Sequence, residues 1–317
     1  MPEHEPRPQP GTVRDWFARR TVDDRHPSPD EVAELAHGQR ITVVLPARNE
    51  AATVGTVVTR LRERLIERVA LLDEIVVVDS HSSDQTADVA RRAGARVVSC
   101  THSPQDGKGG ALRSGIDAVD ADVVVFLDAD VEAPHDGFVT GLVAPLLRDP
   151  DLVLVKAFYD RPFLPDGAVA DDAPDAARPS GGGRVTELVA RPEIADRAPA
   201  LAGFAQPLSG EYAVRRTAVY QHPFVSGYGV DIGLLLTVLE RYGLDAMAQV
   251  DLGRRVHRHQ DLVALGRMAL QVRASFDLCL DGRSEVTDVH TRFVRDDSDR
   301  LVLQHDRVVT RLLPPPP

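Results

Sequence analysis

Residues 123–130, Val-Val-Val-Phe-Leu-Asp-Ala-Asp, are the stretch from which the fold of this chain can be predicted. The five apolar residues are typical of a strand buried on both faces of a parallel sheet. Asp128 and Asp130 follow directly, and side chains two residues apart in extended backbone lie on the same side. Carboxylate oxygens are the ligands that hard divalent cations prefer. The stretch therefore indicates a cation and diphosphate site at a strand end, although aspartates are also common in exposed turns.

Two other apolar runs, residues 41–45 and 74–78, end in polar residues in the same way. The first leads into Pro-Ala-Arg-Asn-Glu and the second into Asp79 and Ser80. Helical patterns separate the runs, at 51–68, 84–93 and 109–118. Repeated strand–helix–strand units of this length predict a parallel sheet with right-handed crossovers and helices on both faces. The polar strand ends would then share one ligand crevice.

Two glycine-containing loops are candidate anion sites. Lys108 lies between glycines directly before a predicted helix, where close backbone approach and a helix N-terminus favour a diphosphate or carboxylate. Its spacing differs from that of a P-loop. Residues 183–186, Gly-Arg-Val-Thr, combine backbone N–H groups, a guanidinium and a hydroxyl that suit a phosphate or carboxylate. A flexible, solvated loop is the alternative for both.

Three side chains in the second half of the chain are further candidates. His257 and His259 follow a predicted strand at 249–252. A histidine beside two aspartates would complete a mixed nitrogen and oxygen ligand set for Mn²⁺ or Mg²⁺, whereas histidines in a polar loop are more often solvated. Asp231 begins a helix predicted at 229–242. There it could cap the helix, accept a hydrogen bond from a sugar hydroxyl, or do both.

Composition excludes several classes of protein. The formal net charge of −11 leaves no basic excess for nucleic acid and disfavours an anionic membrane surface, and no apolar stretch approaches the ~20 residues that span a bilayer. The two cysteines provide neither a disulfide framework nor a metal cluster, so we expect a reducing cytoplasm. A dehydrogenase is disfavoured because no G-x-G-x-x-G follows a strand. No Ser-His-Asp or Cys-His arrangement suggests acyl transfer.

Four segments of the first half resemble the nucleotide-sugar half of a GT-A glycosyltransferase: residues 43–50, 78–80, 107–109 and 128–130. Segments of the second half narrow the resemblance to actinobacterial glucosyl-3-phosphoglycerate synthases: residues 155–159, 181–192, 206–212, 227–233 and 243–246. The likeness is collinear from about residue 40 to residue 275. It implies an α/β, GT-A (Rossmann-like) fold with a mostly parallel sheet flanked by helices and a C-terminal, acceptor-side helical region.

The resemblance implies a retaining enzyme that moves a hexose from a nucleoside diphosphate sugar, with UDP-glucose favoured, to 3-phosphoglycerate. Mg²⁺ or Mn²⁺ is the implied cofactor, bound by Asp130 and His257. Asp231, Lys108 and Asp130 are the implied catalytic residues. The implied donor site comprises Pro46, Ala47, Arg48, Asn49, Glu50, Ser80, Lys108, Asp128, Ala129, Tyr228, Gly229 and Asp231. The implied acceptor site comprises Gly183, Arg184, Val185, Thr186 and His259.

The resemblance also sets the expected organisation of the chain. We expect a polar N-terminal extension over residues 1–38, a glycosyltransferase domain over 39–280 and a charged tail over 281–317 that ends in four prolines. Within the domain, the nucleotide-sugar half would span 39–150 and the acceptor half 151–280, including a long surface loop at 160–183. A homodimer is implied, with helix 262–280 and the tail as candidate contacts.

Three departures from the family pattern leave alternatives open. Asp231 stands where the family has glutamate, His259 stands where it has asparagine, and residues 193–200 are more polar than usual. A related enzyme could therefore glycosylate another small molecule, such as a low-molecular-weight thiol, from a different nucleotide sugar. A non-catalytic nucleotide-binding module is a second alternative. A nucleotidyltransferase is a third, but it usually needs a Gly-rich loop with Arg and Lys where residues 46–50 stand.

The expected mechanism is front-face transfer with retention. No carboxylate is placed as a nucleophile for a double displacement, so a leaving phosphate oxygen would take the proton of the acceptor. The transition state would be oxocarbenium-like. Asp231 would orient the sugar rather than attack it.

Overall fold

The computed structural model describes residues 10–23, 26–131, 136–160, 183–254, 262–295 and 298–316. An eight-stranded sheet forms its centre. From edge to edge the sheet runs β1 (Thr21–Val22), β9 (Met247–Arg254), β6 (Leu154–Asp160), β7 (Tyr212–Arg215), β5 (Val123–Phe126), β2 (Ile41–Ala47), β3 (Glu74–Asp79) and β4 (Arg96–Ser99). Only β7 runs antiparallel to its neighbours in this sheet. The predicted α/β fold with a mostly parallel sheet is thus confirmed.

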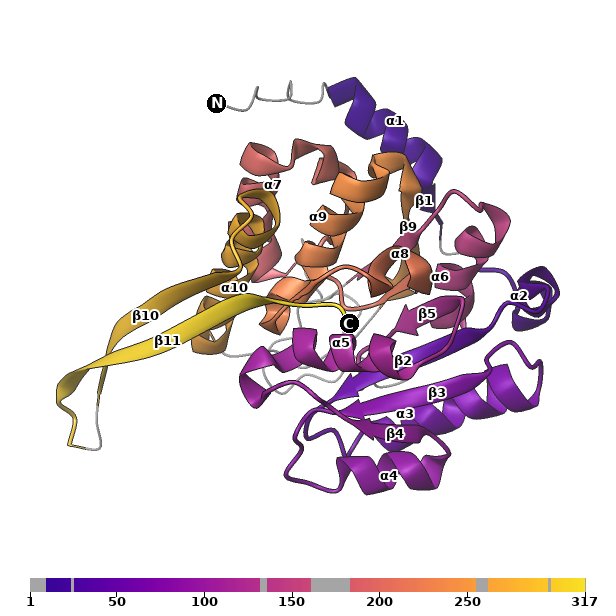
Figure 1. Ribbon diagram of the computed structural model, residues 1–317, viewed down its shortest axis with the longest axis horizontal. Helices are drawn as coiled ribbons and strands as arrows, with labels where there is room; N and C mark the ends of the chain where they lie inside the picture. Colours follow the sequence, from indigo (N-terminus) through magenta and orange to yellow (C-terminus); the bar gives the residue numbers. More distant parts are fainter. Residues whose placement is uncertain are drawn as a thin grey trace, which may run out of the picture.

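Helices cover both faces of the sheet (Figure 1). One face carries α2 (Pro29–Ala36), α3 (Val54–Leu61), α4 (Thr86–Ala93) and α6 (Gly137–Arg148). The other carries α1 (Pro10–Arg20), α5 (Gly107–Ala118), α7 (Arg191–Arg197), α8 (Arg216–Tyr220), α9 (Val230–Tyr242) and α10 (Leu262–Leu280).

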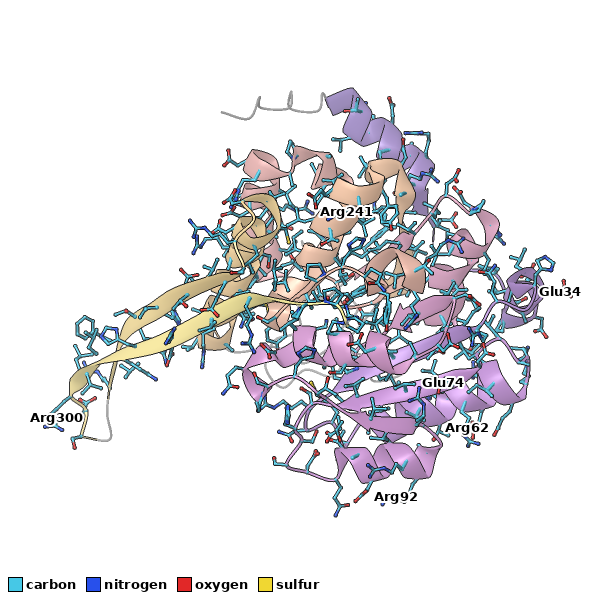
Figure 2. All side chains as sticks on the ribbon, in the orientation of Figure 1. Glu34, Arg62, Glu74, Arg92, Arg241 and Arg300 are labelled. Carbon is cyan, nitrogen blue, oxygen red and sulfur yellow. The ribbon has the colours of Figure 1, made fainter. Side chains whose placement is uncertain are left out.

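The central strands are apolar throughout because alternate side chains enter two different cores. In β2, Val43 and Leu45 pack into the core under α3 and α6, whereas Val44 packs into the core under α5 and α9. Figure 2 shows labelled charged side chains such as Glu34, Arg62 and Arg92 on the outside of the molecule. No helix among the described residues is both long and apolar enough to cross a bilayer.

The N-terminal residues, predicted to be a polar extension, contribute three elements to this fold. Trp16 of α1 is buried, its ring centroid lies 4.7 Å from that of Phe204, and its indole N–H donates to the Leu244 carbonyl at 3.1 Å. Strand β1 pairs in parallel with β9. Ser28 and Glu31 form a capping box at the start of α2, as their spacing predicts.

The C-terminal residues, predicted only as a charged tail, form a long hairpin, which corrects that expectation. Strand β10 (Glu285–Arg295) pairs antiparallel with β11 (Leu301–Leu313), and the end of β11 pairs with β8 (Phe224–Val225). Figure 1 shows the hairpin projecting from the body of the molecule. Its two strands lie mostly exposed. The sequence therefore shows only weakly the alternation of apolar and polar residues by which a half-buried strand is recognised.

Two helices differ in detail from the sequence patterns. The helix predicted at 51–68 begins at Val54, without a side-chain cap, and ends in a π-helical segment, η1 (Arg62–Glu67). The helical segment after residue 183 is π-helical in η3 (Thr186–Ala190) before it continues as α7. All but the two end residues of the predicted loop at 160–183 lie outside the described residues.

Candidate active site

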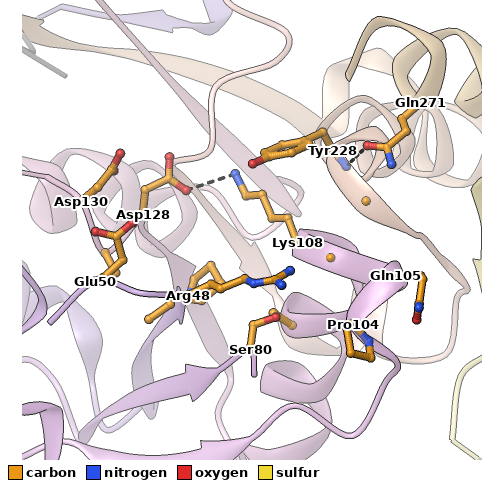
Figure 3. A pocket seen from close by; sticks show the side chains of 16 residues that line it. Arg48, Glu50, Ser80, Pro104, Gln105, Lys108, Asp128, Asp130, Tyr228 and Gln271 are labelled. Carbon is orange, nitrogen blue, oxygen red and sulfur yellow. Dashed lines mark hydrogen bonds and ion pairs between the residues drawn. The ribbon is translucent and has the colours of Figure 1, made fainter. Parts of the chain in front are cut away.

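A cavity of about 430 Å³ opens at the carboxyl ends of β2, β3 and β5 (Figure 3). Its volume lies in the range of small-molecule sites, and the direction of strand order changes between β2 and β5, where α/β sheets usually bind ligands. Most residues predicted for the donor site line it: Pro46, Ala47, Arg48, Glu50, Ser80, Lys108, Asp128, Ala129 and Tyr228. Asp130, predicted as a catalytic residue and metal ligand, lines it as well.

Other lining residues were not predicted. Pro104 and Gln105, from the 3₁₀ turn η2 (Pro104–Asp106), and Gly227, from η5 (Gly227–Gly229), carry no polar strand-end signal. Gln271 comes from α10, and its Oε1 accepts a hydrogen bond from the Tyr228 N–H at 3.0 Å. A glutamine within an amphipathic helix gives no sequence signal of a binding role.

Lys108 links the two sides of the cavity. Its ammonium lies 3.1 Å from Oδ1 of Asp128 and 3.2 Å from Oδ2 of Asp231, and Figure 3 shows it reaching toward Asp128. Burial lowers the pKa of Lys108, but Asp128 and Asp231 outweigh burial and hold this pKa well above its ordinary value. The lysine therefore stays charged and ready to balance an anionic ligand.

Asp231 is buried in the first turn of α9 and does not line the cavity itself. The N-cap of that helix is Gly229, so the interpretation of Asp231 as a helix cap is wrong. Burial raises the pKa of Asp231, although Lys108 and Lys156 oppose the shift. Asp231 is thus connected to the cavity through its ion pair with Lys108, which does line the cavity.

Gly210 leaves the space that this cluster needs. Strands β5 and β7 pair with Phe126 opposite Tyr212, so the chain beyond them brings residue 210 against Asp128. A Cβ at position 210 would lie 2.6 Å from Oδ2 of Asp128 and even closer to Nζ of Lys108. Only glycine fits here without separating the ion pair.

Comparison with known proteins identifies the family. The profile of glycosyl transferase family 2 matches residues 42–208, more than half of the chain. The chain belongs to this family. The protein is therefore a glycosyltransferase, and the resemblance seen in the sequence is confirmed.

Relatives narrow this assignment. The glycosyltransferase is 46% identical over 250 residues to glucosyl-3-phosphoglycerate synthase of Mycobacterium tuberculosis (strain ATCC 25618 / H37Rv), covering 77% of this chain and 75% of that one. It is 39% identical over 286 residues to the enzyme of the same name from Petrotoga mobilis, covering 86% of each chain.

Solved structures agree with this grouping. Mannosyl-3-phosphoglycerate synthase from Rubrobacter xylanophilus matches with a TM-score of 0.81 at 34% identity, covering 97% of this chain and 98% of that chain. The Mycobacterium tuberculosis glucosyl-3-phosphoglycerate synthase in complex with Mn²⁺ and UDP-glucose matches with a TM-score of 0.76 at 39% identity, covering 93% and 97%.

The remaining predicted residues of the glycosyltransferase lie away from the cavity or beyond the described chain. Asn49 adopts a left-handed backbone, and its Oδ1 accepts from the Ser83 N–H at 2.8 Å, so it shapes the loop beside the cavity. Gly229 follows Tyr228 without lining the cavity. Gly183, Arg184, Val185 and Thr186 lie at the start of the helical segment that contains η3, and His257 and His259 are outside the described residues.

The described carboxylates supply part of a cation site. Asp128 and Asp130 both line the cavity, and their oxygens suit Mg²⁺ or Mn²⁺. Within the described ranges no group of three or more His, Cys, Asp or Glu side chains could hold a metal. Of the two predicted metal ligands, Asp130 therefore lines the cavity, and His257 lies outside the described residues.

A buried charged layer supports the cluster from below. Lys156 of β6 donates to the Ser209 carbonyl at 2.8 Å, and its ammonium lies 4.5 Å from the Tyr212 ring centroid. Glu211 is fully buried and accepts from the Tyr159 hydroxyl at 3.0 Å. Burial lowers the pKa of Lys156 to about 8. A charged residue within an apolar strand, such as Lys156 in β6, is a sequence signal of a buried charged group.

Replacing Lys156 with methionine should change how stability depends on pH. The pKa of Lys156 falls from 10.5 to about 8 on folding, so between these values the unfolded state binds more protons and the wild type gains stability as pH rises. The free energy of unfolding of the wild type relative to Lys156→Met should therefore increase by about 2 kcal/mol from pH 7 to pH 10. Urea denaturation at each pH measures this difference. A difference that stays constant across the range would contradict the depressed pKa.

Proposed function

We propose that this glycosyltransferase transfers glucose from UDP-glucose to 3-phosphoglycerate with retention of configuration. The observation that carries the proposal is the position of Lys108 between Asp128, on the side assigned to the nucleotide, and Asp231, on the side assigned to the sugar. The synthases from two bacteria that share its family support the choice of donor and acceptor.

The donor would occupy the cavity with its nucleotide on the β2 and β3 ends. Residues 46–50 and Ser80 would hold the nucleoside, and the Lys108 ammonium would face the diphosphate. Asp130 would bind Mg²⁺ or Mn²⁺, with His257 as a second protein ligand, and Asp128 would lie against the nucleotide. A cation bound there offsets negative charge on the leaving diphosphate.

Asp231 is poorly suited to attack the sugar. Its carboxylate is buried and engaged by Lys108, so it would orient the sugar instead. The acceptor hydroxyl would then approach the anomeric carbon from the side of the leaving group, and a phosphate oxygen would take its proton. Residues 183–186 and His259 would hold the acid and phosphate of the acceptor.

Turnover with defined substrates tests the function. The purified protein should form glucosyl-3-phosphoglycerate from UDP-glucose and 3-phosphoglycerate with Mg²⁺ or Mn²⁺, and removal of the cation with EDTA should stop the reaction. Because a mannosyl relative matches the structure closely, a nucleotide-linked mannose belongs in the same assay, as does a low-molecular-weight thiol acceptor. No product from UDP-glucose and 3-phosphoglycerate with either cation would overturn the proposal.

The Asp130→Ala variant tests the cation site. Loss of a ligand should lower activity by at least about 100-fold, because charge on the leaving group is no longer offset. Calorimetric titration should show that Mn²⁺ no longer strengthens UDP binding. Asp88→Ala, which removes an exposed carboxylate of α4, is the matched control and should behave as wild type. Full activity of Asp130→Ala would show that Asp130 is not a ligand of the catalytic cation.

We further propose that the enzyme is a homodimer in which the hairpin contacts a second copy. A two-stranded hairpin is marginal on its own, yet β10 and β11 expose large apolar side chains on paired positions, including Phe293 opposite Leu303. Light scattering should give a dimer mass for the wild type and a monomer for Phe293→Asp combined with Leu303→Asp. Tyr242→Asp, on exposed surface of α9, is the control. A monomeric wild type would overturn the assignment.

We also place the enzyme in the cytoplasm. Cys100 and Cys279 are both free thiols, which is ordinary for a protein of a reducing compartment. Fractionation of the cells that make the protein tests this location.

A further inference from the structure

Arg311 of β11 makes a two-pronged ion pair with Asp106, 205 residues away in the sequence. Its Nε and Nη2 each donate to one carboxylate oxygen of Asp106 at 2.8 Å. Asp106 is only 2% exposed, and it ends η2, directly before Gly107 and Lys108 of the cavity. The C-terminal strand is therefore fastened to the segment that carries the phosphate-facing lysine.

The backbone of the same residue holds a second segment that lines the cavity. The Ser226 N–H donates to the Arg311 carbonyl at 2.9 Å, and the Arg311 N–H donates to the Ser226 hydroxyl at 3.0 Å. Ser226 is buried and directly precedes Gly227 and Tyr228, which line the cavity. One residue thus contacts both segment 104–108 and segment 226–228.

The two segments pack against each other without spare room. A Cβ at Gly109 would overlap the Val225 carbonyl oxygen, and a Cβ at Gly107 would lie 3.4 Å from the Gly227 Cα. A shift of either segment therefore displaces the other. Close-packed interiors transmit such shifts because they have few voids to absorb them.

We propose that Arg311 is a positioning residue for the donor site. It holds segment 104–108 against segment 226–228, and so fixes where Lys108 meets the diphosphate and where Tyr228 meets the sugar. This inference rests on the proposed donor, a nucleoside diphosphate sugar.

The charge of Arg311 matters as well as its place. Ser103 also donates to Asp106, from its N–H at 3.1 Å and its hydroxyl at 2.9 Å. Burial would raise the pKa of Asp106, but Arg311 and Ser103 outweigh burial and hold this pKa below its ordinary value. Without the guanidinium, the buried carboxylate would keep only Ser103 as a hydrogen-bond donor among the described residues, and such a charge is costly. Segment 104–108 would then move to give the carboxylate water.

Calorimetric titration of the full chain with UDP and Mn²⁺ tests this role. Arg311→Met should weaken UDP binding about tenfold, the scale expected for losing a bidentate charge-assisted contact, and raise the KM for UDP-glucose more than that for 3-phosphoglycerate. Arg311→Lys, which keeps the charge, should recover part of the affinity. Arg292→Met is the matched control, because Arg292 pairs with Asp306 within the same hairpin and does not reach the cavity segments.

A second set of variants separates positioning from simple support of the hairpin. If the two side chains act through each other, Asp106→Asn combined with Arg311→Met should weaken UDP binding no more than the more damaging single change. Equal UDP affinity in the wild type and Arg311→Met would overturn the inference alone. An equal loss in Arg311→Met and Arg292→Met would also overturn it, since the effect would then belong to hairpin stability. A wild type that binds no UDP would overturn both this inference and the proposed donor.

Discussion

The ion pairs of Lys108 are the interaction on which the rest of the site depends. They join the end of β5, the start of α5 and the start of α9 through Asp128 and Asp231. A buried ammonium or carboxylate without a partner is strongly destabilising, so these three elements hold one another in place. The cavity lies beside them, and its lining includes the carboxylates of Asp128 and Asp130 and the ammonium of Lys108. In the proposed function, an incoming diphosphate would meet a charge that is already positioned, and Lys108 would exchange partners rather than be recruited from solvent.

The reversal of β7 places a second layer under this cluster. Because β7 runs antiparallel between β5 and β6, the chain that enters it passes Gly210 against Asp128 and brings Glu211 beside Ala157 and Tyr212 opposite Lys156. An all-parallel sheet would have put a connecting helix there instead. Lys156 and Glu211 are both buried and add charges below the site. The direction and order of the strands, rather than any one side chain, thus place charged residues beneath the cavity.

The parts of the structure that were predicted from sequence are those with local signals. The apolar runs that form β2, β3 and β5, the polar residues at their ends and the glycines around Lys108 are each visible within about ten residues of chain, so both the fold and most of the donor cavity could be predicted. The hairpin of β10 and β11 could not, because its exposed strands lack a strong apolar alternation. The burial of Trp16 and the ion pair of Arg311 with Asp106 could not be predicted either, since each depends on a partner roughly two hundred residues away.

By itself, the sequence determined that Asp128 and Asp130 end a buried strand beside a lysine loop, because extended apolar runs and their polar ends are encoded residue by residue. It did not determine which carboxylates Lys108 would meet. Only the tertiary structure decided that Asp231 belongs to the same cluster, that Gly210 makes room for it and that Arg311 contacts both segment 104–108 and segment 226–228. The physical reason is that these contacts arise from strand register and helix packing, which bring distant segments within hydrogen-bond distance and leave no periodic trace in the chain.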